Sequence, residues 1–310
     1  MEFSHISVLL NEAVDSLNIK SDGIYVDGTA GGAGHSREIA AKLKEGTLYA
    51  FDRDPDAASV AAERLKGYNA IVVNENYINF DSVLTARGID KIDGLLLDLG
   101  VSSYQIDNAE RGFSFHGNAP LDMRMSKSGA SAADIVNNYD AAALCEIFQK
   151  YGEEKFAYKI ANEIVKRRPI YATGELAQLI SDVVPAKFKR DGHPARKCFQ
   201  ALRIAVNGEL DDTAGVLEKA FKRLNVGGRI AVITFHSLED RIVKQTFNRF
   251  CEGCTCPPDF PVCVCGKKPL GKLVNKKPII PSAQEIENNP RSRSAKLRVI
   301  EKIREDQTVE

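Results

Sequence analysis

The sequence contains no tryptophan and only three methionines, and 7% of its residues are aromatic. It also lacks any run of about 18 or more apolar residues, the length that a membrane-spanning helix needs. The segment before Asn11 has neither the basic flank nor the apolar core of a signal peptide. With 44% apolar and 27% charged residues, the composition excludes a disordered chain. We therefore expect a soluble, cytoplasmic protein without a membrane partner.

The chain also lacks the cysteine pattern of a secreted, disulfide-linked protein. Its seven cysteines are odd in number, and five of them fall between Cys251 and Cys265. This cluster could bind zinc, but its two C-x-C pairs are poorer ligand spacings than C-x2-C. A zinc site and a loop of reduced thiols both stay open. Cys145 and Cys198 lie on apolar faces of expected helices and are predicted to be core residues.

No charge of one sign dominates the chain, because 42 basic residues balance 42 acidic ones. The balance hides a split. Residues 1–149 hold 12 Lys/Arg and 22 Asp/Glu, whereas residues 150–310 hold 30 and 20. Within residues 267–304, 11 basic residues stand against 3 acidic ones. This asymmetry fits either a polyanionic partner of the basic half or a solvated surface.

Short apolar runs alternate with helical patterns over the first hundred residues. Asp54-Pro55 is typical of an N-cap followed by the first helical residue, and it predicts a helix to about Lys66. Repeated strand–helix units of this kind predict a parallel sheet with helices on both faces. The predicted strands are 23–27, 47–52, 70–73 and 92–97.

From 107 to 207 only helical patterns follow, at 141–151, 154–168, 174–184 and 196–206. The strand–helix rhythm then resumes. A helix over 209–224 is expected to lead through a Gly227-Gly228 turn into a strand over 229–235. Ser237 with Asp240 resembles a capping box for a helix to about 250, and a last strand is expected at 297–300. We therefore predict three parts: a first part of a sheet domain (1–106), an inserted helical domain (107–207) and a second part of the sheet domain (208–310).

A glycine-rich segment from Asp27 to His35 lies between the first expected strand and a helix. Glycines allow a ligand to approach the backbone, and the free N–H groups of a helix start favour an anionic group. The segment does not fit G-x-G-x-x-G, which weakens a dinucleotide interpretation. Because open α/β sheets bind ligands at the carboxyl ends of their strands, a ligand site is favoured over a simple turn.

Asp52 ends the second expected strand, 21 residues after Gly31. An acid at this place accepts hydrogen bonds from both hydroxyls of a ribose, whereas Asp54 is better placed as a helix cap. The two motifs predict an adenosine-containing ligand and do not alone separate NAD from S-adenosyl-L-methionine. The acid Asp27 at the tip of the first strand and the missing pyrophosphate pattern favour S-adenosyl-L-methionine.

Two further strand ends carry candidate chemistry. The segment Asp98–Ser103 follows the fourth strand, where an acid can orient an exocyclic amine, although an ordinary turn would look the same. The segment Phe235–Arg241 follows the fifth strand and adds an imidazole and several charges, in either a functional or a structural role. Asp98 is the candidate catalytic residue, because it can accept a hydrogen bond from the amine and stabilise positive charge on nitrogen.

These segments resemble the bacterial ribosomal RNA small subunit methyltransferase H family, the N4-cytidine methyltransferases of 16S rRNA. The resemblance covers nearly the whole chain, in one order. It is carried by residues 5–10, 27–36, 98–103 with Gln105, 111–115, 120–125, 151–156, 193–210, 227–241 and 292–298.

The resemblance implies a class I (Rossmann-like) S-adenosylmethionine-dependent methyltransferase sheet with an inserted all-helical domain for substrate recognition. It implies methyl transfer from S-adenosyl-L-methionine to N4 of a cytidine in the decoding region of 16S rRNA, within the small ribosomal subunit. It implies no metal ion. The implied cofactor-binding residues are Ala33, Gly34, His35, Asp52, Tyr77, Asp98 and Gln105.

The sequence departs from the family at a few places. Tyr77 stands where phenylalanine is expected, although a tyrosine ring can also stack on adenine. Tyr104 stands where proline is common, and Asp98-Leu99-Gly100-Val101 lacks the prolines and the aromatic residue of the amino-methyltransferase pattern. How the base is held therefore stays open.

A stacked cytosine hides its amine, so the target must be unpaired or extruded. Tyr104, Phe113 and Phe115 could stack on it, or they could be core residues. Basic residues of the insert could hold phosphates, or they could be solvated. These basic residues are Lys166, Arg167, Arg168, Lys187, Lys189, Arg190, Arg196 and Lys197.

Two other functions remain as alternatives. A nicotinamide-dependent oxidoreductase would have a similar first hundred residues, and cofactor binding distinguishes it. A non-catalytic RNA-binding or assembly factor would keep the cofactor site, and methyl transfer distinguishes it.

Overall fold

The computed structural model of the protein describes residues 7–189, 192–253, 256 and 265–305. The chain folds into two compact units: an α/β unit of Met1–Gly100 with Leu210–Glu310, and a helical unit of Val101–Glu209. The expected boundaries, after 106 and after 207, differ from these by a few residues. The first expected boundary falls inside a short helix, α5 (Ser103–Asp107), because the chain leaves the sheet directly after the fourth strand.

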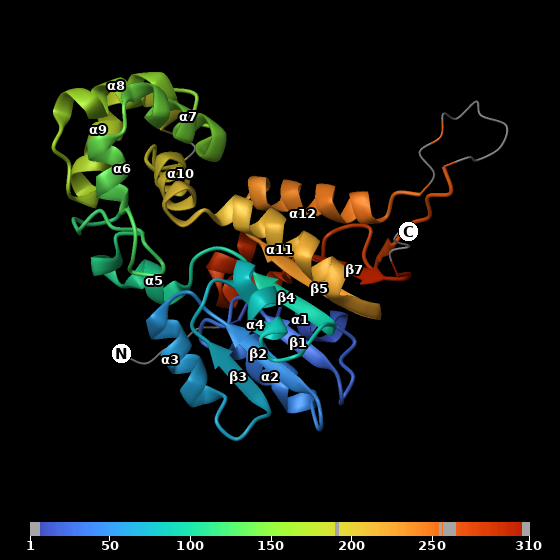
Figure 1. Ribbon diagram of the computed structural model, residues 1–310. Helices are drawn as coiled ribbons and strands as arrows, with labels where there is room; N and C mark the ends of the chain where they lie inside the picture. Colours follow the sequence, from blue (N-terminus) through green and yellow to red (C-terminus); the bar gives the residue numbers. More distant parts are fainter. Residues whose placement is uncertain (1–6, 190–191, 254–255, 257–264, 306–310) are drawn as a thin grey trace. The chain divides into compact units, whose positions relative to one another are not determined.

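The α/β unit is built on a seven-stranded sheet with the order β3-β2-β1-β4-β5-β7-β6 (Figure 1). Strands β1 to β5 pair in parallel, whereas β7 is antiparallel to both of its neighbours. This order confirms the Rossmann-like class expected from the sequence. The strands are β1 (Ile24–Asp27), β2 (Thr47–Phe51), β3 (Ala70–Val73), β4 (Ile92–Asp98), β5 (Leu224–Thr234), β6 (Gly271–Leu273) and β7 (Lys296–Lys302).

Helices cover both faces of this sheet, and each face has its own core. Leu96 and Ile233 pack with residues of α1, α2 and α3 on one face. Their neighbours Leu97 and Val232 pack with residues of α4, α11 and α12 on the other. Strands buried on both faces explain the continuous apolar runs in the sequence. The helices are α1 (Leu10–Ser16), α2 (Gly34–Lys42), α3 (Pro55–Arg64), η1 (Tyr77–Asn79), α4 (Phe80–Thr85), α11 (Glu209–Arg223), α12 (Ser237–Phe250), α13 (Ala283–Asn288) and η4 (Pro290–Ser294).

Strand β5 begins at Leu224, so the prediction of a turn at Gly227-Gly228 is wrong. Gly227 has a φ of 85°, and the register of β5 against β4 shifts between Leu224 and Arg229. A glycine in this conformation permits a β-bulge, which keeps the strand paired on both sides of it. The short edge strand β6 was not expected, because three residues carry no readable period.

Of the two helix N-caps that the sequence predicts, one is confirmed and the other is wrong. Asp54 caps α3 as predicted, since its side chain accepts a hydrogen bond from the Asp56 backbone at 3.1 Å. The predicted cap of α12 is wrong, because Ser237 is its first helical residue. The N-cap is His236, whose ring accepts from the Glu239 backbone, while the Glu239 carboxylate accepts from the His236 backbone. A histidine ring thus takes the capping role assigned to the serine.

The helical unit has no strand within 101–189 and 192–209, apart from a single bridge between Pro120 and Ala172. Its core includes Phe148 and Cys198, which confirms Cys198 as a core residue, whereas Cys145 is only partly buried and packs against that core. The four expected helices are present; the short α5 and α6 were not expected. The helices after α5 are η2 (Ala109–Arg111), α6 (Ala132–Asn138), α7 (Ala141–Gly152), α8 (Ala157–Arg167), α9 (Thr173–Val183), η3 (Ala186–Phe188) and α10 (Arg196–Asn207).

None of the helices in the described ranges has both the length and the apolar character required to span a bilayer.

Candidate functional site

Three aspartates lie at the carboxyl ends of neighbouring strands in the α/β unit. Asp27 ends β1, Asp98 ends β4, and Asp52 directly follows β2. The chain runs outward from β1 to β3 and then returns to β4 on the other side of β1. Ligands of open α/β sheets bind at such a switch point. The fold therefore gathers the three acids that the sequence analysis singled out at strand ends.

The loop between β1 and α2 borders this edge. Arg64 of α3 donates a hydrogen bond to the Gly32 carbonyl at 2.6 Å, which holds the loop from outside. Gly31 has a φ of 50°, and a Cβ there would meet only the Thr29 carbonyl, at an ordinary contact distance of 3.8 Å. A Cβ on Gly34 would instead collide with the Ser7 side chain. Glycine is thus required by packing at position 34, whereas position 31 favours glycine through its positive φ.

Ala33, Gly34 and His35 form the start of α2, with Ala33 as a left-handed N-cap. Nε2 of the buried His35 ring lies 3.0 Å from the Val8 carbonyl. Because a carbonyl only accepts, Nε2 carries the proton and Nδ1 of the neutral ring is an acceptor. Burial lowers the pKa of His35 to about 4. The ring is therefore neutral at physiological pH, and its Nδ1 lies 3.8 Å from Asp98 Oδ2.

Asp98 is half-buried, and one of its two carboxylate oxygens is an unused hydrogen-bond acceptor within the described residues. Its backbone nitrogen donates to Thr29 Oγ1 at 2.6 Å, which fixes the strand end. Its Oδ1 is buried and has no hydrogen-bond partner within the described part of the chain. Burial raises the pKa of Asp98 well above its ordinary value, and the charges of Asp27 and Glu239 raise it further. A cation placed beside Oδ1 would reverse this shift and favour the carboxylate.

Asp52 is held by two backbone donors. Gly31 donates to its Oδ2 at 2.7 Å and Asp54 donates to its Oδ1 at 2.8 Å. Each carboxylate oxygen has two lone pairs, so each can accept one further hydrogen bond. Burial raises the pKa of Asp52 to about 6, although the two donors oppose this. The two remaining acceptor positions match a pair of vicinal hydroxyls.

Asp27 is 1% exposed and engaged on both oxygens. Ser36 donates to one oxygen at 2.5 Å, and the Thr29 backbone donates to the other at 3.0 Å. Its charge raises the pKa of both Asp52 and Asp98. Asp27 thus supports the loop and sets the electrostatics of its neighbours.

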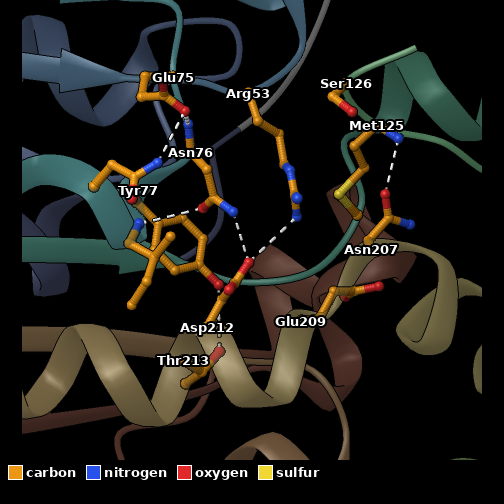
Figure 2. Close-up of polar contacts among 12 residues, drawn as sticks. Arg53, Glu75, Asn76, Tyr77, Met125, Ser126, Asn207, Glu209, Asp212 and Thr213 are labelled. Atoms are coloured by element: carbon orange, nitrogen blue, oxygen red, sulfur yellow. Dashed lines mark hydrogen bonds and ion pairs between the residues drawn. The ribbon is translucent and has the colours of Figure 1, made fainter. Parts of the chain in front are cut away.

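Tyr77 follows β3, and segments distant in sequence hold it in place. Figure 2 shows its hydroxyl pointing at Thr213 of α11, with 3.4 Å between the two oxygens. Beside it, Asn76 donates to the Asp212 carboxylate at 2.6 Å, and the Arg53 guanidinium lies 3.7 Å from the same carboxylate (Figure 2). The hydroxyl that distinguishes tyrosine from phenylalanine therefore has a structural partner. These contacts were not predicted, because no local sequence pattern relates residues 136 or more positions apart.

Gln105 belongs to the helical unit. Its side-chain oxygen accepts from the Ser102 backbone at 3.1 Å, and Ser102 Oγ accepts from the Gln105 backbone at 3.2 Å. This capping box starts α5 and accounts for a glutamine at this position. A role of Gln105 in cofactor binding stays a prediction.

The segment after β5 adds His236 and Glu239 to the edge of the sheet. Glu239 is 1% exposed, and its charge raises the pKa of Asp98. The next residue, Asp240, instead pairs with Arg298 at 2.6 Å and with Lys296 at 3.3 Å. Glu239 and Asp240 therefore face different neighbours, because consecutive residues of a helix point about 100° apart.

The expected phosphate contacts of the helical unit are partly engaged elsewhere. Arg168 donates to the Val136 carbonyl at 2.7 Å. Arg167 pairs with Glu163 at 2.7 Å and with Asp182 at 3.1 Å. Arg168 therefore has a structural role, and a phosphate would compete with two carboxylates for Arg167.

Two of the aromatic residues expected to stack on the target base, Phe113 and Phe115, have partners within the helical unit. Phe115 stacks on His193, with 4.7 Å between ring centroids and 17° between planes. Phe113 lies beneath the Arg111 guanidinium at 5.8 Å. Stacking of either ring on a base stays a prediction.

The cysteine cluster is only partly described. Cys251 is a free cysteine, and Cys256 and Cys265 are also described, whereas Cys254 and Cys263 lie outside the described residues. Within the described ranges, no three His, Cys, Asp or Glu side chains gather as metal ligands would. The zinc site and the loop of reduced thiols both stay predictions.

Comparison with known proteins places this geometry in context. The chain matches the MraW methylase family over residues 2–303. It is 56% identical over 309 residues to the ribosomal RNA small subunit methyltransferase H of Clostridium botulinum strain Loch Maree, covering 98% of this chain and 100% of that protein. The same values hold for the protein of that name from strain Kyoto. Among solved structures, an rRNA methylase from Streptococcus thermophilus gives a TM-score of 0.45 at 13% identity, covering 97% of this chain and 100% of that one.

Proposed function

The chain belongs to the MraW methylase family, and from this premise we propose that it methylates N4 of a cytidine in 16S rRNA with S-adenosyl-L-methionine. The proposed substrate is the decoding region within the small ribosomal subunit. Relatives at 56% identity, named ribosomal RNA small subunit methyltransferase H, support this substrate class. The observation that carries the proposal is the buried Oδ1 of Asp98 at the switch point of the sheet, which has no hydrogen-bond partner among the described residues.

The residues at this edge fit S-adenosyl-L-methionine, which supplies an electrophilic methyl group when bound. Asp52 keeps two acceptor positions for the ribose hydroxyls. A Cβ on Gly31 would meet only the Thr29 carbonyl at 3.8 Å, so the loop backbone is uncrowded there, and Tyr77 offers an aromatic ring for adenine. Asp98 supplies a buried acceptor for a cationic group. Ala33, Gly34 and His35 would contribute through the backbone at the start of α2, because the His35 side chain is engaged by Val8.

The catalytic role proposed for Asp98 follows from the chemistry of the amine. The N4 lone pair of cytosine is delocalised into the ring, so the amine is a poor nucleophile and becomes acidic only as the methyl arrives. The enzyme therefore needs an oriented acceptor rather than a strong base. Asp98 stabilises positive charge that grows on nitrogen, which is preferential binding of the transition state. Alternatively, Asp98 holds the ammonium of the cofactor while the Leu99 carbonyl contacts the amine.

Mass spectrometry of 16S rRNA tests the function, with cells that have or lack the protein. We expect loss of one N4-methylated cytidine without the protein, and its restoration by the wild-type chain but not by Asp98→Asn. An unchanged methylation pattern in cells without the protein would contradict the proposal.

Cofactor binding separates the proposal from the oxidoreductase alternative. We expect purified protein to retain labelled S-adenosyl-L-methionine and not NAD. Transfer of label to isolated small subunits further excludes a non-catalytic assembly factor.

A further inference from the structure

A cavity lies in the α/β unit, at the carboxyl end of β5. It has a volume of about 300 Å³, at the lower end of the range for small-molecule sites. The end of β5, the segment around α13 and the turn before β7 surround it. Its lining includes Phe235, His236, Ile280, Ile286, Arg293 and Lys296.

This cavity adjoins the reactive edge but is separate from the cofactor loop. None of its lining residues comes from the loop after β1 or from the end of β2. The Leu99 backbone donates to Ile233 at 3.0 Å, so the end of β4 is tied to the strand that leads into the cavity. The Phe235 ring lies 3.6 Å from the Cβ position of Gly100. The cavity therefore begins one strand away from Asp98, a spacing of about 4.8 Å.

The walls of the cavity are largely apolar. Ile280 is 65% exposed, and Ile286 and Pro281 lie on the same lining. An apolar residue this exposed beside a reactive edge offers a surface for the flat face of a base. Nε2 of His236 is buried at the cavity and has no hydrogen-bond partner among the described residues, although it lies 3.0 Å from Glu239 Oε1.

One cation of the lining is available for a ligand. Lys296 shares the Asp240 carboxylate with Arg298. Arg293 is exposed and, within the described ranges, has neither an ion pair nor a hydrogen bond from its side chain. A guanidinium of this kind suits a phosphate, since its donors match two oxygens at once. The surrounding residues 267–304 carry 11 basic and 3 acidic residues, which favours a polyanion.

We propose that this cavity binds the RNA nucleotide next to the target cytidine, with the base on the isoleucine wall and a phosphate on Arg293. The assignment of RNA rests on the proposed function. Proteins hold single-stranded nucleic acid with cations along the backbone and aromatic side chains against the bases, and this lining places Phe235 and the isoleucines with Arg293. By holding this nucleotide, the cavity would determine which nucleotide of the RNA reaches Asp98.

Affinity for a short single-stranded oligoribonucleotide with a central cytidine tests the proposal. Fluorescence anisotropy is measured with the full-length protein over a range of salt concentrations. We expect Arg293→Gln to lower the affinity about tenfold at low salt and to reduce the slope of log K against log salt by about 0.7, the share of one phosphate. Ile280→Ser should lower the affinity severalfold and leave the slope unchanged, because it removes no charge.

Lys44→Gln is the matched control. Lys44 is exposed and lies before β2, at the opposite end of the strands. Its substitution should leave both affinity and slope unchanged. Because the Arg293 and Ile280 side chains are exposed, all three variants should keep the melting temperature of the wild type. Wild-type affinity and slope in Arg293→Gln, or an equal loss in Lys44→Gln, would overturn the proposal.

Crosslinking gives a second measurement. An oligoribonucleotide with 4-thiouridine beside the cytidine should crosslink within residues 280–296, and crosslinks only in the helical unit would overturn the assignment. A polyglutamate peptide should not compete; if Arg293→Gln weakens the peptide and not the RNA, the occupant is an acidic protein.

Methyl transfer to small subunits, measured in parallel, separates the two proposals. If the wild type transfers methyl and Arg293→Gln binds RNA normally, the cavity proposal fails and the function stands. If the wild type transfers none and Arg293→Gln still loses RNA affinity, the methyltransferase function fails, and the cavity remains an RNA-binding site without a target cytidine.

Discussion

Carboxyl groups in two regions of the α/β unit have pKa values that move in opposite directions. At the ends of β2 and β4, burial raises the pKa of Asp52 to about 6 and that of Asp98 well above its ordinary value. Near the start of α12, burial also acts on Asp240, but Arg298 and Lys296 outweigh it and lower the pKa. The acid that ties α12 to β7 has its own cations. Within the described part of the chain, Asp52 and Asp98 at the switch point have no Lys or Arg partner, so a ligand can supply the positive charge.

We expect the largest effect from a substitution of Asp98, the proposed catalytic residue. Asp98→Asn keeps the shape and removes the charge. We expect single-turnover methylation, with saturating cofactor and small subunits, to slow about 10²-fold or more, a typical order for one oriented electrostatic group. Asp240→Asn, its counterpart with cations, should methylate at the wild-type rate. A wild-type rate for Asp98→Asn would falsify its chemical role.

Asp52 should show the next largest effect, on binding. Asp52→Ala removes the acceptors proposed for the ribose, and charge-assisted hydrogen bonds of this kind are worth ~1.5–3 kcal/mol. The affinity for S-adenosyl-L-methionine should therefore fall about 10- to 150-fold, as measured by calorimetry. An unchanged affinity would show that Asp52 does not bind the cofactor, and it would weaken the distinction between ligand-binding acids and the paired Asp240.

The raised pKa of Asp52 makes cofactor binding sensitive to pH. A carboxyl with a pKa of about 6 is ionised at higher pH and becomes protonated as the pH falls through that value. Since the carboxylate is the better acceptor, the affinity should fall by up to about tenfold per pH unit below pH 6. Asp52→Asn should bind more weakly and lack this dependence. If titrations between pH 5 and pH 8 show the same slope in both proteins, another group is responsible.

The smallest effect concerns the paired acid. The folded-state pKa of Asp240 is lowered, so its contribution to stability is present above the unfolded pKa and is lost as the pH falls through the folded value. Asp240→Asn should lower the free energy of unfolding by about 1 kcal/mol at neutral pH and by less in acid. Urea unfolding measures this. Cofactor affinity should not change; a change would mean that the Asp240 pairs also support the cofactor site.

Local sequence patterns were sufficient to predict most strands of the sheet. Ala70–Val73 was predicted at its observed bounds, and Asp54 caps its helix as expected, because an apolar run and a capping side chain have local causes. Gly227 was misread because a glycine pair is typical of both a turn and a bulge, and only the pairing of β5 with β4 distinguishes them. The N-cap of α12 was predicted wrongly because serine caps helices more often than histidine does.

The sequence by itself determined where the candidate acids Asp52 and Asp98 stand, since each follows an apolar strand and the ends of parallel strands share one edge. Only the tertiary structure decided which acids keep a cation and which do not. The partners of Asp240 lie 56 and 58 residues away, and Thr213 reaches Tyr77 across 136 residues. Desolvation and ion pairing depend on such distant neighbours, so the electrostatic difference between Asp98 and Asp240 exists only in the folded chain.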